Sequence, residues 1–308
     1  MRTAFIETLF ELARRDERIT LIVGDLGFGV VEQFMRELPN QFVNAGVAEQ
    51  NMTGLAAGMA LIGRTVFTYS IANFPVMRCL EQIRNDVCYH NANVKIVAVG
   101  GGMAYGAVGM THHATEDLAV MRALPNLVVV APNDPIETRS VTRAVAAHNG
   151  PCYLRLGRAG EPIVHKTQID LQIGKAIRVR EGNDLTLIVT GGLLQNVLQV
   201  ASLLAERGAQ ARVLSMHTIK PSDSTAVLAA AKETRAVFTI EEHSVIGGLG
   251  GAVSELLAEA GLPSVKFKRI GLHDSFSSIV GDQEYLRSVY GLDPPGILRT
   301  IESTLELA

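Results

Sequence analysis

Short apolar runs alternate with helix-length segments along the whole chain, and this alternation constrains the fold more than any other feature. In the first half, the runs are rich in β-branched residues and occupy residues 19–23, 64–69, 94–99 and 127–131. Buried runs of that kind are typical of a parallel sheet covered by helices on both faces. Asn133-Asp134-Pro135 marks the start of a helix over residues 136–147, because it offers a capping carboxylate and a proline at the first helical position. A strand at residues 152–156 completes this α/β domain.

The second half repeats the pattern after an interruption. Between residues 157 and 172 the periodicity gives way to Gly, Pro, His and Lys, which predicts a linker. Beyond it, strands are expected at residues 185–190, 211–215, 236–240 and 265–270, and helices at residues 193–207, 222–231 and 250–260. The glycine-rich run 247–253 follows a loop and not a strand, so we interpret it as a packing turn and not as a nucleotide site. We therefore predict two α/β domains, 1–165 and 166–308, of which the second is the smaller.

Composition and charge exclude several classes of partner. The formal net charge of −3 and a pI of about 6.3 provide no basic surface, so we expect neither nucleic acid nor an anionic membrane as a partner. Cys79, Cys88 and Cys152 form an odd set without a CxxC pair, which is typical of buried thiols in a reducing compartment and predicts no metal site. The N-terminal segment lacks a signal-cleavage pattern, and no apolar run approaches the length of a membrane span. We expect a cytoplasmic protein that acts on small molecules.

Glu49 is the residue that most needs an explanation. It lies in Val47-Ala48-Glu49-Gln50-Asn51, at the start of a Gly/Ala-rich helix over residues 52–61, within an otherwise apolar region. A carboxylate in such a place needs a partner, and the small residues of the helix let another backbone or a flat cofactor approach closely. Taken alone, a glutamate at a helix start is more often a capping or surface group, so its role depends on the rest of the sequence.

The segment after the next expected strand carries aromatic and small polar residues. Tyr69 and Phe74 lie there, and a helix containing Arg78 and Arg84 follows. The carboxyl ends of parallel strands are where such sheets build sites. On their own, Tyr69 and Phe74 are more often residues of an ordinary core.

A glycine-rich loop at residues 100–109 follows the strand at 94–99 and leads into His112 and His113. Such a loop can approach a ligand closely. Adjacent histidines in an extended stretch point to opposite sides, so the two are not expected to ligate one metal. We favour His112 as the site residue, although a loop histidine on its own is more often a structural donor.

These motifs, in this order, resemble those of transketolases. The resemblance rests on Asp25-Leu26, Gly46-Val47-Ala48-Glu49-Gln50-Asn51, Tyr69-Ser70 with Phe74, Gly109-Met110-Thr111-His112, Pro132-Asn133-Asp134, and the segment from Arg155 to Arg158. More closely, the chain is similar to the C-terminal half of a transketolase, a pyrimidine-binding domain followed by the transketolase C-terminal domain, as in split transketolases encoded as two chains. The resemblance covers nearly all of the chain and implies a thiamine-diphosphate-dependent enzyme that transfers a two-carbon ketol unit from a ketose phosphate to an aldose acceptor.

The resemblance assigns roles around the cofactor. Glu49 would hydrogen-bond the N1′ nitrogen of the aminopyrimidine and so promote loss of the thiazolium proton, which requires a carboxylate held in a poorly hydrated pocket. Phe74, helped by Tyr69, would stack on the aminopyrimidine. Pro75 is the alternative to Phe74 for the residue that stacks on the aminopyrimidine.

The resemblance also assigns roles around the reacting substrate. His112 would contact the reacting oxygens and assist proton transfer. His113 stands where the family has a glutamine, and we place it with the substrate-binding residues. The family's acid four residues before the histidine is Val108 here, which predicts a different selectivity for the substrate hydroxyls.

Phosphate recognition in transketolases uses two arginines, a serine and a histidine. Arg2 and Arg158 fall where the arginines belong, and Arg155 is a further possible donor. The serine position is Gly29 and the histidine position is Gly100, so half of the usual set is missing. The expected substrates are therefore sugar phosphates or variants with branching, deoxygenation or another acidic group.

The resemblance further implies a partner chain. The family's diphosphate-binding half carries a Gly-Asp-Gly motif that holds Mg²⁺ and the cofactor diphosphate, and neither Gly24-Asp25-Leu26 nor Gly281-Asp282-Gln283 matches it. We expect an N-terminal transketolase subunit to supply the Mg²⁺ and diphosphate site. Symmetric pairing then predicts a heterotetramer of two plus two chains.

Two alternatives remain from the sequence. The same plan resembles the β-subunit of 2-oxo acid dehydrogenase E1 components and the equivalent half of deoxyxylulose-phosphate synthase, but Thr111-His112-His113 and Arg2 favour transketolase. A non-catalytic assembly subunit of the same fold is the other alternative, and the presence of Glu49 and His112 argues against it.

Overall fold

Parallel strands form the centre of the first domain. The computed structural model describes residues 1–262 and 265–306. Its seven-stranded sheet has the order β10-β5-β6-β4-β3-β1-β2, and only the pairing of β10 with β5 is antiparallel. The strands are β1 (Ile19–Val23), β2 (Phe42–Asn44), β3 (Thr65–Ile71), β4 (Val94–Val99), β5 (Val128–Val130), β6 (Cys152–Leu156) and β10 (Thr218–Lys220). The expected strands of the first half are all present, and the α/β fold is confirmed.

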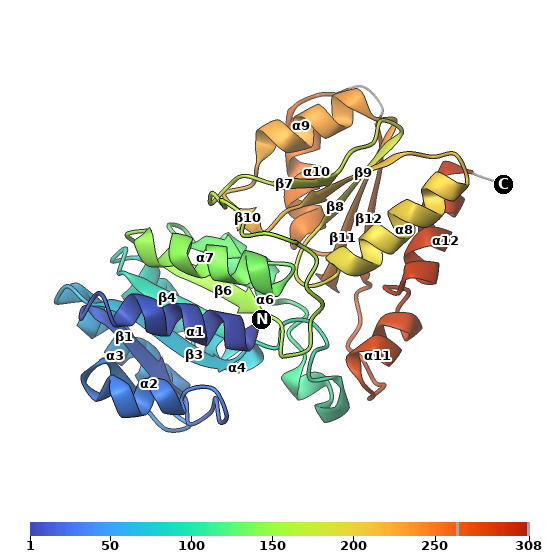
Figure 1. The fold of residues 1–308 in the computed structure, drawn as a ribbon. Coiled ribbons are helices and arrows are strands. Elements are labelled where there is room, and N and C mark those ends of the chain that lie inside the picture. Colours follow the sequence, from blue (N-terminus) through green and yellow to red (C-terminus); the bar gives the residue numbers. More distant parts are fainter. Residues whose placement is uncertain (263–264, 307–308) are drawn as a thin grey trace.

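Helices cover both faces of this sheet (Figure 1). Neighbouring strand residues point to opposite faces, so Leu21 packs with α1 and α7 while Ile22 packs with α3 on the other side. The helices are α1 (Arg2–Ala13), α2 (Glu32–Glu37), α3 (Glu49–Leu61), α4 (Asn73–Met77), α5 (Leu80–Gln82), α6 (Asp117–Ala123) and α7 (Pro135–Ala147), with short turns η1 (Pro39–Gln41), η2 (Ile83–Cys88), η3 (Gly106–Val108) and η4 (Met110–His112).

Two helix starts in the first domain follow the sequence closely. The side chain of Asp134 accepts a hydrogen bond from the Glu137 amide, and Pro135 occupies the first turn of α7, as predicted. Glu49 is the first residue of α3. By contrast, the helix expected to contain Arg78 and Arg84 is divided into α4, α5 and η2, because the backbone leaves the helical region at Cys79 (φ −111°, ψ 12°).

The second domain is a smaller α/β unit. Its sheet has the order β12-β11-β8-β9-β7, with only β7 antiparallel to its neighbour. The strands are β7 (Ile177–Arg180), β8 (Leu185–Val189), β9 (Ala211–Ser215), β11 (Ala236–Ser244) and β12 (Lys266–Leu272). The helices are α8 (Leu194–Glu206), α9 (Ser224–Glu233), α10 (Leu249–Glu259), α11 (Gln283–Val289) and α12 (Pro294–Leu305), and they flank the sheet on both sides (Figure 1).

The two domains are joined by a strand and by an apolar cluster that the sequence did not predict. After β9 the chain returns to the first domain, where β10 pairs with β5 at the edge of the first sheet. One apolar cluster also contains residues of both sheets, such as Ile96 from β4 and Ile188 from β8. None of the helices within residues 1–262 and 265–306 combines the length and apolar character needed to cross a membrane.

Candidate active site

The carboxyl ends of four parallel strands, β1, β3, β4 and β6, meet at one edge of the first sheet. The loops that leave these strands begin near residues 24, 72, 100 and 157. They carry four of the eight side chains that the sequence identified as site residues: Phe74, His112, His113 and Arg158. This edge of the sheet is therefore the candidate site.

Glu49 is buried beside this edge, with only 1% of its surface exposed. Its Oε2 atom accepts a hydrogen bond from Nη1 of Arg78 at 2.7 Å. The Arg78 side chain is 48% exposed, so the partner of this buried carboxylate lies at the surface of the chain. The sequence indicated that Glu49 needs a partner but did not identify Arg78 as that partner.

Phe74 lies next to this ion pair. The guanidinium carbon of Arg78 is 5.0 Å from the centre of the Phe74 ring, a cation–π distance. The His112 ring meets the Phe74 ring edge-on, with 5.1 Å between centres and 69° between planes. Phe74 is half-buried whereas Pro75 is buried, so Phe74 is the member of this pair that presents an accessible face.

Tyr69 lies elsewhere, and the expectation that it assists Phe74 needs correction. Its ring is 1% exposed and stacks on Phe5 of α1, with 6.1 Å between centres and 9° between planes. The alternation of β3 directs Tyr69 to the α1 face of the sheet, where the ring belongs to the apolar core. It cannot stack on a ligand there.

The two adjacent histidines have different surroundings, although His112 ends the 3-10 helix η4 and the stretch is not extended as expected. The His112 ring lies between Phe74 and Tyr105, and its centre is 6.4 Å from that of Tyr105. His113 is only 4% exposed, and its Nε2 atom has no hydrogen-bond partner among the described residues. Burial lowers the pKa of His113 below its usual value.

Tyr105 lies near the two arginines expected to bind phosphate. The Arg158 guanidinium carbon is 5.1 Å from the centre of the Tyr105 ring. Burial raises the pKa of the Tyr105 hydroxyl, and the nearby charges of Arg158 and Arg2 act in the opposite direction. A side chain at Gly100 would collide with the Tyr105 ring, so this ring fills the space beside Gly100. The sequence contained this signal, a tyrosine within the glycine-rich loop, but we did not identify Tyr105 as a site residue.

Arg155 also differs from the expectation. It is buried within β6, and its Nε donates to Asp117 at 2.9 Å. Its Nη2 atom donates to two carbonyl oxygens, that of Ala114 and that of Glu242 in the second domain. The strand directs this side chain into the domain interface, so Arg155 supports the loops of the site and does not face a sugar phosphate.

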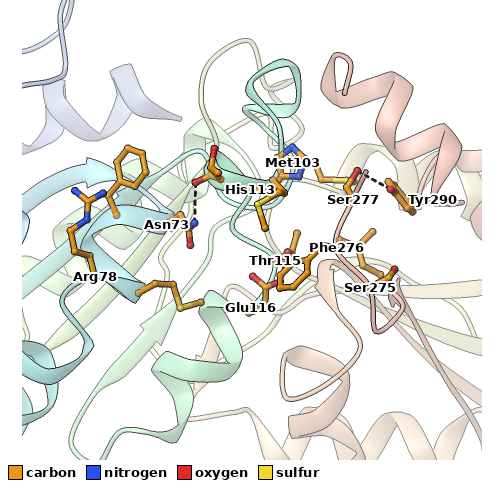
Figure 2. Close-up of a pocket in the computed structure, with 15 residues that line it drawn as sticks. Asn73, Arg78, Met103, His113, Thr115, Glu116, Ser275, Phe276, Ser277 and Tyr290 are labelled. Atoms are coloured by element: carbon orange, nitrogen blue, oxygen red, sulfur yellow. Dashed lines mark hydrogen bonds between the residues drawn. The ribbon is translucent and has the colours of Figure 1, made fainter. Parts of the chain in front are cut away.

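A cavity of about 530 Å³ adjoins the site between the two domains (Figure 2). Phe74 and Arg78 contribute to its wall from the first domain, and Phe276 and Tyr290 from the second. His113 lines it as well. No group of three His, Cys, Asp or Glu side chains within residues 1–262 and 265–306 is arranged to hold a metal ion.

The fold and the strand-end site define an α/β enzyme of the kind that binds small ligands at the carboxyl ends of parallel strands. A family model described as the transketolase pyrimidine-binding domain matches residues 1–160, and one described as the transketolase C-terminal domain matches residues 174–297. The chain therefore belongs to the transketolase family, of which it carries these two domains. The family depends on thiamine diphosphate.

Individual relatives agree with this assignment. A protein of Phocaeicola vulgatus, named as one subunit of an apulose-4-phosphate transketolase, is 42% identical over 97% of this chain and 95% of its own length. A protein of a Clostridium species named 6-deoxy-6-sulfo-D-fructose transketolase subunit SqwH is 38% identical over 99% of this chain and 94% of its own length. A solved structure described as a split gene transketolase, inactive beta4 tetramer, has a TM-score of 0.89 at 37% identity and covers 99% of this chain and 98% of that chain.

These comparisons confirm the resemblance seen in the sequence. The chain is the C-terminal subunit of a transketolase-type transferase. The deoxyxylulose-phosphate synthase alternative is the weaker one, because those relatives are less similar to the chain.

Proposed function

We propose that the chain supplies half of a thiamine-diphosphate site, the half that receives the pyrimidine ring, together with a subsite for the anionic end of a sugar. The observation that carries the proposal is the placement of Glu49, a buried carboxylate that, among the described residues, accepts one hydrogen bond, from a half-exposed arginine. A nitrogen of the pyrimidine ring can form a hydrogen bond with the Glu49 carboxylate without the unfolding of any helix or strand. The accessible face of Phe74 beside it suits the ring.

The residues of the chain then have separate tasks. Glu49 accepts a hydrogen bond from the aminopyrimidine N1′ or shares a proton with it, and its burial strengthens that interaction. Phe74 orients the ring, and His112 at its edge donates to an oxygen of the reacting sugar. When bound, thiamine diphosphate supplies an electron sink for the two-carbon unit released by cleavage of the ketose.

Arg2, Arg158 and Tyr105 bind the anionic end of the substrate. The two arginines provide charge, and the protonated Tyr105 hydroxyl provides a neutral donor. His113 lines the adjacent cavity, and there it contacts the substrate. The relatives named for apulose-4-phosphate and for 6-deoxy-6-sulfo-D-fructose support a substrate other than a common pentose phosphate.

The Mg²⁺ and diphosphate site belongs, in this proposal, to an N-terminal subunit in a heterotetramer of two plus two chains. The Phocaeicola relative is named as one subunit of its enzyme, and a similar β4 tetramer is described as inactive, which supports the need for a second chain. The three cysteines are free and buried, which supports a cytoplasmic location.

Reconstitution tests the proposal. The purified chain, its N-terminal partner and their mixture are assayed for ketol transfer with thiamine diphosphate and Mg²⁺. We expect activity only from the mixture. Ketol transfer by this chain alone would contradict the proposal, and pyruvate-dependent reduction of an artificial electron acceptor by the mixture would instead indicate a 2-oxo acid dehydrogenase.

A further inference from the structure

The loop that carries Tyr105 and His112 is closed at its base. Gly102 and Ala114 exchange two backbone hydrogen bonds, each 2.9 Å long, so residues 103–113 project as one closed loop. Arg155 also stabilises the base, since its Nη2 atom donates a hydrogen bond of 2.8 Å to the carbonyl of Ala114. The position of the base therefore determines where both site residues lie.

Glu242, at the end of β11 in the second domain, holds this base from the other side. Its Oε1 atom accepts a hydrogen bond from the Met103 amide at 2.6 Å. The Met103 side chain is fully buried in the apolar core of the second domain. A side chain at Gly102 would collide with Oε1 of Glu242, so the carboxylate is in direct contact with the loop backbone.

Helix α11 fixes Glu242 in turn. Gln283 donates to Oε1 at 2.8 Å, and Arg287 donates to Oε2 at 2.6 Å. Burial lowers the pKa of Arg287, but the negative charges of Glu242 and Glu284 raise it by more, so the arginine remains charged. The carboxylate is thus held in one orientation by three donors.

The same helix contacts the loop directly. The loop, drawn in teal, lies beside α11 in Figure 1, and η3 contacts α11. A methyl group at Gly106 would meet the carbonyl of Gly281 and the side chain of Leu286, both at 2.5 Å. Glu242 and α11 therefore determine the position of the loop at its base and at η3.

We propose that Glu242 is a positioning residue for the site, through which the C-terminal domain sets the location of Tyr105 and His112. This inference rests on the proposed function, since it gives the C-terminal domain a task within that site. Misplacement of a substrate-binding group by about 1 Å lowers a rate by about 100-fold, so a small shift of the loop has a large effect.

Glu241 provides a matched control. It precedes Glu242 on the same strand, is equally buried, and accepts hydrogen bonds from the amides of Leu249 and Gly250 at the start of α10. These contacts with α10 direct the Glu241 carboxylate away from the loop. Glu241→Gln perturbs the same domain by the same chemical change without touching residues 102–114.

The experiment compares Glu242→Gln, Glu241→Gln and the parent in the reconstituted complex with the N-terminal subunit. Hydrogen exchange of peptides spanning residues 102–114 reports the loop, bound thiamine diphosphate counts the sites, and kcat/KM for the sugar donor reports catalysis. For Glu242→Gln we expect faster exchange in the loop and about a 100-fold lower kcat/KM at unchanged cofactor stoichiometry. For Glu241→Gln we expect parental exchange in the loop and parental kcat/KM.

Gln283→Ala serves as a second variant, because it removes one hydrogen bond to Glu242 without leaving a buried charge unpaired. We expect faster loop exchange and about a fivefold lower kcat/KM. Parental loop exchange in folded Glu242→Gln would overturn the inference, as would parental values in Gln283→Ala if Glu242→Gln does not fold. Equal losses in Glu241→Gln would also overturn it. An inactive parent complex would contradict the proposed function alone, since loop exchange remains measurable without activity.

Discussion

Glu49 and Glu242 are equally buried carboxylates in opposite situations. Each is 1% exposed, and each lies near the carboxyl end of strands in its own domain. Among the described residues, the carboxylate of Glu242 accepts three hydrogen bonds, while that of Glu49 accepts one, from a half-exposed arginine. Donors within the protein hold both oxygens of the Glu242 carboxylate, whereas the Glu49 carboxylate can accept a further hydrogen bond from a ligand. Burial alone does not distinguish a structural acid from a functional one, whereas the number and exposure of its partners does.

The largest expected effect is on catalysis at Glu49. Glu49→Gln keeps the shape of the side chain but removes the proton acceptor, so kcat of the reconstituted complex should fall by about 1,000-fold. Stopped assays of ketol transfer measure this loss, with Glu17→Gln, an exposed acid, as control. Parental kcat in Glu49→Gln would favour the non-catalytic assembly subunit.

The next effect is on stability in the second domain. Arg287→Ala leaves the Glu242 carboxylate buried without its charged partner, which should lower the free energy of unfolding by about 3 kcal/mol. Urea unfolding of the chain measures the change. An unfolding midpoint like that of the parent would show that Glu242 is not held as the comparison requires.

A smaller effect is expected at the anionic subsite. Tyr105→Phe removes one hydrogen-bond donor to a charged group while keeping the ring that fills the space at Gly100, so KM for an anionic sugar should rise by about tenfold. KM for the corresponding uncharged sugar should not change. Tyr89→Phe, at a tyrosine that is 81% exposed, is the control. Equal changes for both sugars would place Tyr105 outside the subsite.

The smallest effect is the stability change at the surface partner of Glu49. Arg78→Ala should cost only about 1 kcal/mol, because the arginine is 48% exposed and water can replace it. The same urea titration measures it beside Arg287→Ala. If the two variants are destabilised equally, the distinction between an occupied and an available carboxylate fails.

The sequence predicted nine of the twelve strands in the described part of the chain and missed the short strands β2, β7 and β10. The start of α7 depends on Asp134 and Pro135, whose effects are local. The apolar runs of β1 and β4 are short and rich in β-branched residues, which favours strands. The strand β10 was not predicted because three residues have no periodicity and its partner β5 lies far away in the chain. Boundaries set by long-range pairing are not visible in local patterns.

The candidate site was predictable in part. Motif order identified Glu49, Phe74 and His112, which the fold brings together. It did not separate Tyr69 from Phe74 or reveal the burial of Arg155, because the face of a strand that meets a helix depends on packing between distant elements. The roles of Arg2, Arg158 and His113 remain predictions.

Because β10 lies beyond the linker, the first sheet is complete only when the second half of the chain is present. β5 consists of Val128–Val130, and β10 occupies its open edge. A fragment ending at residue 165 would lack this strand and expose three valines with unpaired backbone groups, a template for aggregation. The linker is therefore a boundary in sequence but not a place where the protein can be cut into soluble halves.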